Sequence, residues 1–335
     1  MTDHPDAPSL FDLGWSAFFA DQVLPEEAGL VPARIASVHR ARLTALGEAG
    51  PVAPVLAVHA TTGDFAVGDF VLVDPATTTL RRRLDRKSVL ERRTEGSRVA
   101  QLAAANVDTL FVVTSCNADF NPARLERYLA MANEGDIDPV IVLTKADTTD
   151  AVARYQTEAA ALQSGLAVVV LNPREPAAAG ALAPWCGPGR TVAVVGSSGV
   201  GKSTLVNTLA GPGQALPQLT GGIREHDAKG RHTTTARSLH AMAGGGFVID
   251  TPGMRTLHVG DAAGGIGTLF SEITELAPAC RFRDCTHAHE PGCAVQAAVA
   301  AGTLDPERLN RWRKLLTENR HNTPVVTGPR GNKRR

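Results

Sequence analysis

Apolar residues recur in two different patterns along the chain. Between residues 31 and 80 they form short runs bounded by turn residues, at 33–38, 52–59 and 70–73. Several short strands within about fifty residues indicate a small β-barrel. An OB-like barrel is the natural candidate because such barrels often bind RNA, although a purely structural barrel fits the same pattern.

From residue 100 onward, apolar strands alternate with helical segments. We expect strands at 110–114, 139–143, 166–171 and 191–195, and helices at 122–133 and 151–164. This alternation predicts a mostly parallel sheet with helices on both faces. Farther along, residues 238–242 and 247–250 flank three glycines and predict a β-hairpin.

These patterns divide the chain into four parts. Residues 1–30 hold six acids and neither Lys nor Arg, which predicts a loosely ordered acidic tail. We expect an OB-like RNA-binding barrel at 31–98 and an α/β domain at 99–270. Residues 271–335 are expected to form a small unit with a helix at 305–319 and a basic tail. The predicted fold class is therefore multidomain α/β.

Composition narrows the setting in which the protein works. No apolar run reaches the roughly eighteen residues of a membrane-spanning helix, and the N-terminus lacks a signal-peptide pattern. Five cysteines, three of them within 280–293, argue against a disulfide framework and favour a reducing compartment with a local metal site. We expect a cytoplasmic monomer that is not bound to a membrane.

The zero net charge hides two basic segments. Residues 81–98 carry eight Lys/Arg against three acids, and residues 305–335 carry nine against three. Solvated surface explains either segment alone equally well. Two such segments on either side of the α/β domain favour a polyanionic partner such as RNA.

Residues 196–204 match the phosphate-loop pattern GxxxxGK[ST]. A strand at 191–195 enters the loop and a helix at 202–210 leaves it, which is the context that this motif requires. Backbone N–H groups would face the phosphates, Lys202 would bridge the β- and γ-phosphates, and Ser203 would bind Mg²⁺. The predicted nucleotide-binding residues are Gly196, Ser197, Ser198, Gly199, Val200, Gly201, Lys202, Ser203 and Thr204.

A second phosphate-facing segment begins at Asp250, which follows an apolar strand. An acid in this place supplies a carboxylate for Mg²⁺, and the Gly253 amide can approach a γ-phosphate because glycine has no Cβ. Between the two motifs, Thr233 and Thr234 are expected to close over Mg²⁺ and the γ-phosphate as a switch segment.

Thr144, Lys145, Ala146 and Asp147 follow the strand at 139–143 and predict a guanine-reading segment. A buried Asp147 carboxylate can accept hydrogen bonds from guanine N1–H and N2–H₂, which adenine lacks. Lys145 would lay its aliphatic stem along the base. The usual motif begins with Asn, so Thr144 removes an amide that would tie the loops together. The alternatives are an ordinary strand-to-helix turn and, for the whole protein, a P-loop ATPase or kinase.

Cys280, Cys285, His287 and Cys293 bring three thiols and one imidazole into fourteen residues. Zn²⁺ favours a tetrahedral Cys₃His shell, and a closed four-ligand site is structural rather than catalytic. One such zinc ion would hold together a unit with a small core. His289 is a competing ligand.

The guanine motif comes before the phosphate loop, the switch threonines and Asp250. This permuted order, together with residues 101–108, residues 230–234 and the cysteine cluster, resembles the circularly permuted GTPases of the bacterial ribosome small-subunit-dependent GTPase A family. The resemblance covers roughly residues 30–325. It implies an OB-like barrel, a circularly permuted P-loop GTPase domain and a C-terminal zinc-binding domain, with His287 as the histidine ligand.

The same resemblance implies a reaction and a partner. The chain would hydrolyse GTP to GDP and phosphate, stimulated by the small ribosomal subunit, whose rRNA it binds late in assembly. A nucleotide switch that binds only proteins is the competing function. Met254 stands where many GTPases place a water-orienting Gln, so His232 becomes the candidate for that role, with a surface histidine as the alternative. Residues 170–173 depart from the family's base-contact loop, and no base contact is predicted there.

Overall fold

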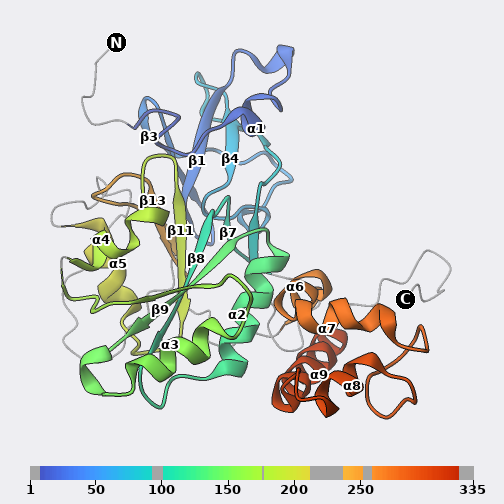
Figure 1. Ribbon diagram of the computed structural model, residues 1–335. Helices are drawn as coiled ribbons and strands as arrows, with labels where there is room; N and C mark the ends of the chain where they lie inside the picture. The colour runs from blue at the N-terminus through green and yellow to red at the C-terminus, as the bar shows by residue number, and fades with distance from the viewer. Residues whose placement is uncertain (1–7, 93–100, 176, 212–236, 252–258, 324–335) are drawn as a thin grey trace.

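One continuous sheet runs through most of the protein. The computed structural model describes residues 8–92, 101–175, 177–211, 237–251 and 259–323. Within these residues, eleven strands join in the order β10-β9-β8-β11-β13-β12-β1-β2-β3, with β4 and β5 added beside β1. A separate antiparallel ribbon consists of β6 (Val89–Arg92) and β7 (Gln101–Ala105). Figure 1 shows the N-terminal strands above the main sheet and the C-terminal helices beside it.

The part of the sheet from β10 to β12 is mostly parallel. Its strands are β8 (Thr109–Ser115), β9 (Asp138–Thr144), β10 (Ala167–Val170), β11 (Thr191–Gly196), β12 (Arg237–Ala241) and β13 (Phe247–Asp250). Neighbouring strands pair in parallel except β12, which forms an antiparallel hairpin with β13. The predicted parallel sheet and hairpin are confirmed.

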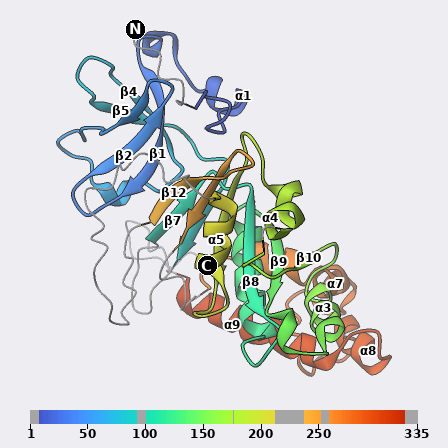
Figure 2. The same ribbon diagram turned by 90° about the vertical axis from the view of Figure 1, so that its left-hand side faces the viewer.

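Helices cover both faces of this parallel sheet, as Figures 1 and 2 show. On one face, Leu110 of β8 belongs to the same core as α2 (Pro122–Glu134) and α3 (Val152–Ala160). On the other face, Phe111 lies in a core with α4 (Ala177–Leu182) and α5 (Lys202–Ala210). Strands that are buried on both faces have unbroken apolar runs, and these runs allowed the strands to be predicted from the sequence.

The N-terminal strands form the expected OB-like arrangement around β1 (Val31–Val38). The first half of β1 pairs with β4 (Phe70–Val73), and the second half pairs with β2 (Leu43–Gly47). β3 (Gly50–Val52) and β5 (Leu80–Arg83) extend the two sides. The end of β1 also pairs with β12, so the barrel is continuous with the main sheet.

The prediction of a strand at 52–59 is wrong. β3 ends at Val52, and the stretch that follows contributes an isolated bridge between Val55 and Thr79. Pro54 has no N–H to donate to a neighbouring strand, which explains why the pairing stops. Val58 is 95% exposed, so the apolar residues of this stretch do not all mark a buried strand.

The prediction of a loosely ordered tail is wrong for residues 8–30. Leu13 and Phe19 are fully buried, and the centroid of the Phe19 ring lies 4.4 Å from the centroid of the Phe70 ring on β4. The Leu13 carbonyl accepts a hydrogen bond from the buried Arg34 at 2.6 Å. Acid content alone suggested a tail, but two apolar side chains between the acids, Leu13 and Phe19, are buried. Phe19 belongs to the short helix α1 (Ala17–Ala20).

The described C-terminal residues form a helical unit against α2. Its helices are α6 (Ala263–Leu269), α7 (Ser271–Leu276), α8 (Ala294–Ala300) and α9 (Pro306–Asn322). A Cβ on Gly265 would lie 2.1 Å from the Ala130 carbonyl oxygen, so glycine lets α6 lie directly on α2. Among the described helices, none combines the length and apolar character needed to cross a membrane.

Candidate functional site

The phosphate-loop residues connect β11 to α5, as predicted. Gly196 has a φ of 140°, and a Cβ there would lie 2.1 Å from the Val113 carbonyl oxygen. Gly201, with a φ of 100°, immediately precedes α5, which starts at Lys202. The backbone therefore turns sharply at both ends of the loop, in conformations that side chains disfavour.

Two side chains of α2 contact this loop, and neither was among the site residues predicted from the sequence. Arg124 Nη1 donates to Ser197 Oγ. Tyr128 is bonded to the Gly196 backbone, and burial raises the pKa of its phenol to about 12. Lys202 Nζ donates to the Ser197 carbonyl oxygen. The Asn121-Pro122 helix start was the available signal, since it fixes where α2 begins relative to the sheet edge.

The guanine motif lies at the same edge of the sheet, because β9 and β11 flank β8 in parallel. Thr144, fully buried, ends β9 and donates from Oγ1 to the Val200 carbonyl oxygen of the phosphate loop at 2.7 Å. The expectation that Thr144 removes the tie between the loops is therefore wrong, since its hydroxyl supplies one. Lys145 has a left-handed φ of 54°, and Asp147 follows in a short 3-10 turn. Asp147 is exposed rather than buried as expected.

The loop after β10 also reaches this edge. The Pro173 carbonyl oxygen accepts a hydrogen bond from Thr208 of α5 at 2.6 Å. A Cβ on Gly201 would lie 3.1 Å from Pro173 Cγ, so the two loops are in close contact. Residues 170–173 lack the family's base-contact pattern, yet Pro173 lies against Gly201 of the phosphate loop.

Asp250 lies at the carboxyl end of β13, level with Val194 of β11. Burial raises the pKa of the Asp250 carboxyl, while nearby His240 and Lys202 oppose that rise. The next residue, Thr251, donates from Oγ1 to the Val194 carbonyl oxygen at 2.7 Å. The predicted site residues His232, Thr233, Thr234 and Gly253 lie outside the described residues.

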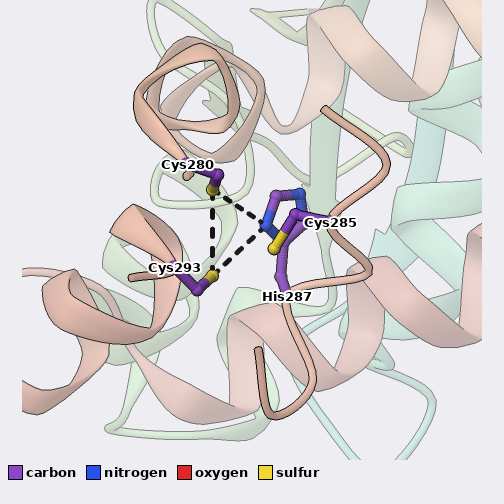
Figure 3. Close-up of side chains that lie close together, drawn as sticks. All are labelled: Cys280, Cys285, His287 and Cys293. Carbon is purple, nitrogen blue, oxygen red and sulfur yellow. Dashed lines mark hydrogen bonds between the residues drawn. The ribbon is translucent and has the colours of Figure 1, made fainter. Parts of the chain in front are cut away.

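The four predicted metal ligands form one cluster. The ligand atoms of Cys280, Cys285, His287 and Cys293 all lie within 4.8 Å of one another, and Figure 3 shows the side chains converging. His287 Nδ1 lies 3.5 Å from Cys280 Sγ and 3.4 Å from Cys293 Sγ. Burial lowers the pKa of His287, which favours the neutral ring that a metal requires. Among the described residues, His287 rather than His289 belongs to the cluster.

Salt bridges neutralise part of the charge in the two basic segments. Three arginines of the first segment pair with acids from other parts of the barrel: Arg81 with Asp74, Arg82 with Glu27, and Arg86 with Asp69. In the second segment, Arg308 and Arg311 both bind Glu126 of α2. The described parts of these segments are therefore less positive than a count of residues implies. Residues 93–98 and 324–335 lie outside the described residues.

Known proteins resemble this chain over most of its length. The sequence model of the RsgA GTPase family matches residues 83–260. A protein of Mesorhizobium japonicum named small ribosomal subunit biogenesis GTPase RsgA is 70% identical, and the match covers 98% of this chain and 94% of that one. The chain belongs to the RsgA GTPase family. A Vibrio vulnificus relative named small ribosomal subunit biogenesis GTPase RsgA 2 is 48% identical, over 96% of this chain and 91% of its own.

Two solved structures share the fold of this chain. The crystal structure of YjeQ from Thermotoga maritima superposes with a TM-score of 0.64 at 25% identity, over 86% of this chain and 98% of that chain. YloQ, described as a circularly permuted GTPase, shares the fold with a TM-score of 0.60 at 23% identity, over 90% of this chain and 99% of its own. The predicted circular permutation is thus confirmed.

Proposed function

We propose that this GTPase binds GTP between the guanine motif and the phosphate loop and hydrolyses it there to GDP and phosphate. The observation that carries the assignment is the hydrogen bond from Thr144 to Val200, which joins two motifs 56 residues apart in the chain. In the proposed site Asp147 reads guanine, with Lys145 along the base, and the backbone of residues 196–201 cradles the phosphates. Lys202 then bridges the β- and γ-phosphates.

Mg²⁺ and the attacking water complete the proposed site. Ser203, Thr233, Thr234 and Asp250 would hold Mg²⁺, directly or through water, and the Gly253 amide would contact the γ-phosphate. His232 is the proposed water-orienting group, because the Met254 thioether cannot perform that role. Replacing His232 with Ala should therefore reduce hydrolysis while leaving GTP binding nearly intact.

The proposed partner is the small ribosomal subunit, contacted through its rRNA late in assembly. The names of the relatives support the subunit, and the OB-like barrel supports an RNA contact. The basic segments support it less than their residue count suggests, since salt bridges occupy several of their arginines. A cytoplasmic location and a monomeric state remain predictions from the sequence.

We propose that the C-terminal unit senses the nucleotide state. Glu318 Oε1 of α9 accepts the Val259 N–H at 3.1 Å, and Asn319 Oδ1 accepts the Ala262 N–H at 2.9 Å. Both bonds hold the chain shortly after Asp250. We propose zinc as the ion of the cysteine cluster, with Cys280, Cys285, His287 and Cys293 as its ligands, because three thiolates and one imidazole suit Zn²⁺. The ion would support the unit that carries α9.

One experiment separates this proposal from its alternatives. GTP and ATP hydrolysis are measured with purified small subunits, with large subunits and alone, at two salt concentrations. We expect slow GTP turnover alone, stimulation by small subunits that weakens with salt, and no stimulation by large subunits. Equal use of ATP would favour the P-loop ATPase or kinase, and GTP hydrolysis that neither subunit stimulates would favour a switch that acts only on proteins.

A further inference from the structure

Helix α2 holds the start of the phosphate loop through two side chains one turn apart. Arg124 donates to the Ser197 hydroxyl, and the buried Tyr128 is bonded to the Gly196 backbone. Residues four apart in a helix share a face, so these contacts form one continuous edge. Ser197 is thereby held from two directions, because its carbonyl oxygen also accepts the Lys202 ammonium.

The helix that carries these side chains is itself fixed in place. Asn121 caps it by accepting the Arg124 backbone N–H at 3.0 Å. Glu126, which is 1% exposed, accepts from Arg308 and Arg311 of α9, each at 2.8 Å. Arg127 adds a 2.6 Å contact with Glu318 of α9. Because these ion pairs hold α2 against α9, the backbone of Arg124 has a fixed position from which its guanidinium contacts the loop.

A loop that binds phosphate through backbone N–H groups depends on the orientation of each peptide. The loop has glycine at 196, 199 and 201, each with positive φ, so little in its own sequence restricts its conformation. Ser197 is the first residue after Gly196, so a hydrogen bond to its side chain restricts the orientation of the peptide groups that follow. The half-buried Arg124 makes such a hydrogen bond from the neighbouring helix α2.

We propose that Arg124, supported by Tyr128, is a positioning residue for the phosphate loop, holding Ser197 so that the loop N–H groups converge on the β-phosphate. The inference rests on the proposed nucleotide site. The simpler alternative is a hydrogen bond that stabilises the fold and does not affect ligand binding. The two differ in which nucleotides are affected, because GMP has no β-phosphate and GDP does.

The test measures GDP and GMP binding to the full chain by competition with a fluorescent guanine nucleotide. Arg124→Ala and Ser197→Ala should each raise the Kd for GDP about tenfold, the effect of one hydrogen bond to a charged group. The double variant should be no weaker than either single variant, since both remove the same contact. The Kd for GMP should not change, and Arg124→Lys should recover part of the GDP affinity. Arg154→Ala, which removes an exposed arginine of α3, is the matched control and should bind GDP normally.

Lys202→Ala keeps this inference distinct from the nucleotide site itself. Normal GDP binding by Lys202→Ala would overturn the proposed site. If Lys202→Ala loses GDP while Arg124→Ala binds it normally, the site stands and the positioning role is refuted. Equal weakening of GDP and GMP, or losses in Arg124→Ala and Ser197→Ala that multiply in the double variant, would also refute that role.

Discussion

The hydroxyl of Thr144 offers the sharpest test of how the guanine motif and the phosphate loop support each other. It is buried and donates to the Val200 carbonyl oxygen at 2.7 Å, with the Thr114 carbonyl oxygen a more distant acceptor at 3.2 Å. Thr144→Val keeps the branched shape and removes the hydroxyl. The Val200 carbonyl then loses a buried partner, which costs about 1–3 kcal/mol.

We expect this cost to appear both in the free energy of unfolding and in GDP affinity. If the misoriented loop weakens the binding free energy of GDP by about 1.4 kcal/mol, the Kd for GDP rises about tenfold. Thr144→Ser retains the donor and should bind GDP within about twofold of the parent chain. Titration calorimetry with GDP and urea unfolding measure the two quantities.

Thr268→Val is the matched control for this substitution. Its hydroxyl is exposed and bonds within its own helix, to the Gly264 carbonyl oxygen at 3.2 Å, so its removal should leave GDP affinity unchanged. The reasoning is refuted if Thr144→Val matches Thr144→Ser in both affinity and stability. A stability loss without any change in GDP affinity would show that the bond supports the fold and does not order the loop.

Two further predictions concern the C-terminal unit. Elemental analysis of purified, reduced protein should find about one zinc per chain. Cys293→Ser should lose this zinc, whereas Cys186→Ser, a substitution outside the cluster, should retain it. Less than half an equivalent of zinc in the parent chain would contradict the zinc assignment. Glu126→Ala should destabilise the protein by about 3 kcal/mol in urea unfolding, because it leaves Arg308 and Arg311 without their shared partner, and Glu126→Ala with Arg308→Met should recover part of that loss. A loss below about 1 kcal/mol would mean that this ion-pair group contributes little.

Elements that are marked by a pattern of neighbouring residues could be predicted from the sequence. The apolar runs placed β8, β9 and β11, and the phosphate-loop motif placed the start of α5 at Lys202. The spacing of Cys280 through Cys293 placed the metal cluster, because all four ligands lie within one short stretch.

Contacts between distant segments could not be predicted from the sequence. Arg127 and Glu318 are 191 residues apart, and neither has a local feature that indicates its partner. For the same reason, charge counts overestimated the basic segments and the acid count misjudged residues 8–30. Thr144 was misread because a motif compares residue types, whereas the structure shows that a hydroxyl can make the link expected of an amide.

Asp147 is the residue that we propose selects guanine in the permuted nucleotide site. In Asp147→Asn, the side chain offers one acceptor and one donor in place of two acceptors, which suits xanthine, whose position 2 carries a carbonyl in place of the amino group of guanine. The direct measurement is competition of GDP, XDP and ADP for the nucleotide site of the parent chain and of this variant. We predict that the parent prefers GDP, that Asp147→Asn prefers XDP, and that ADP competes with neither. Unchanged GDP preference in Asp147→Asn, or equal displacement by ADP in the parent chain, would contradict the account.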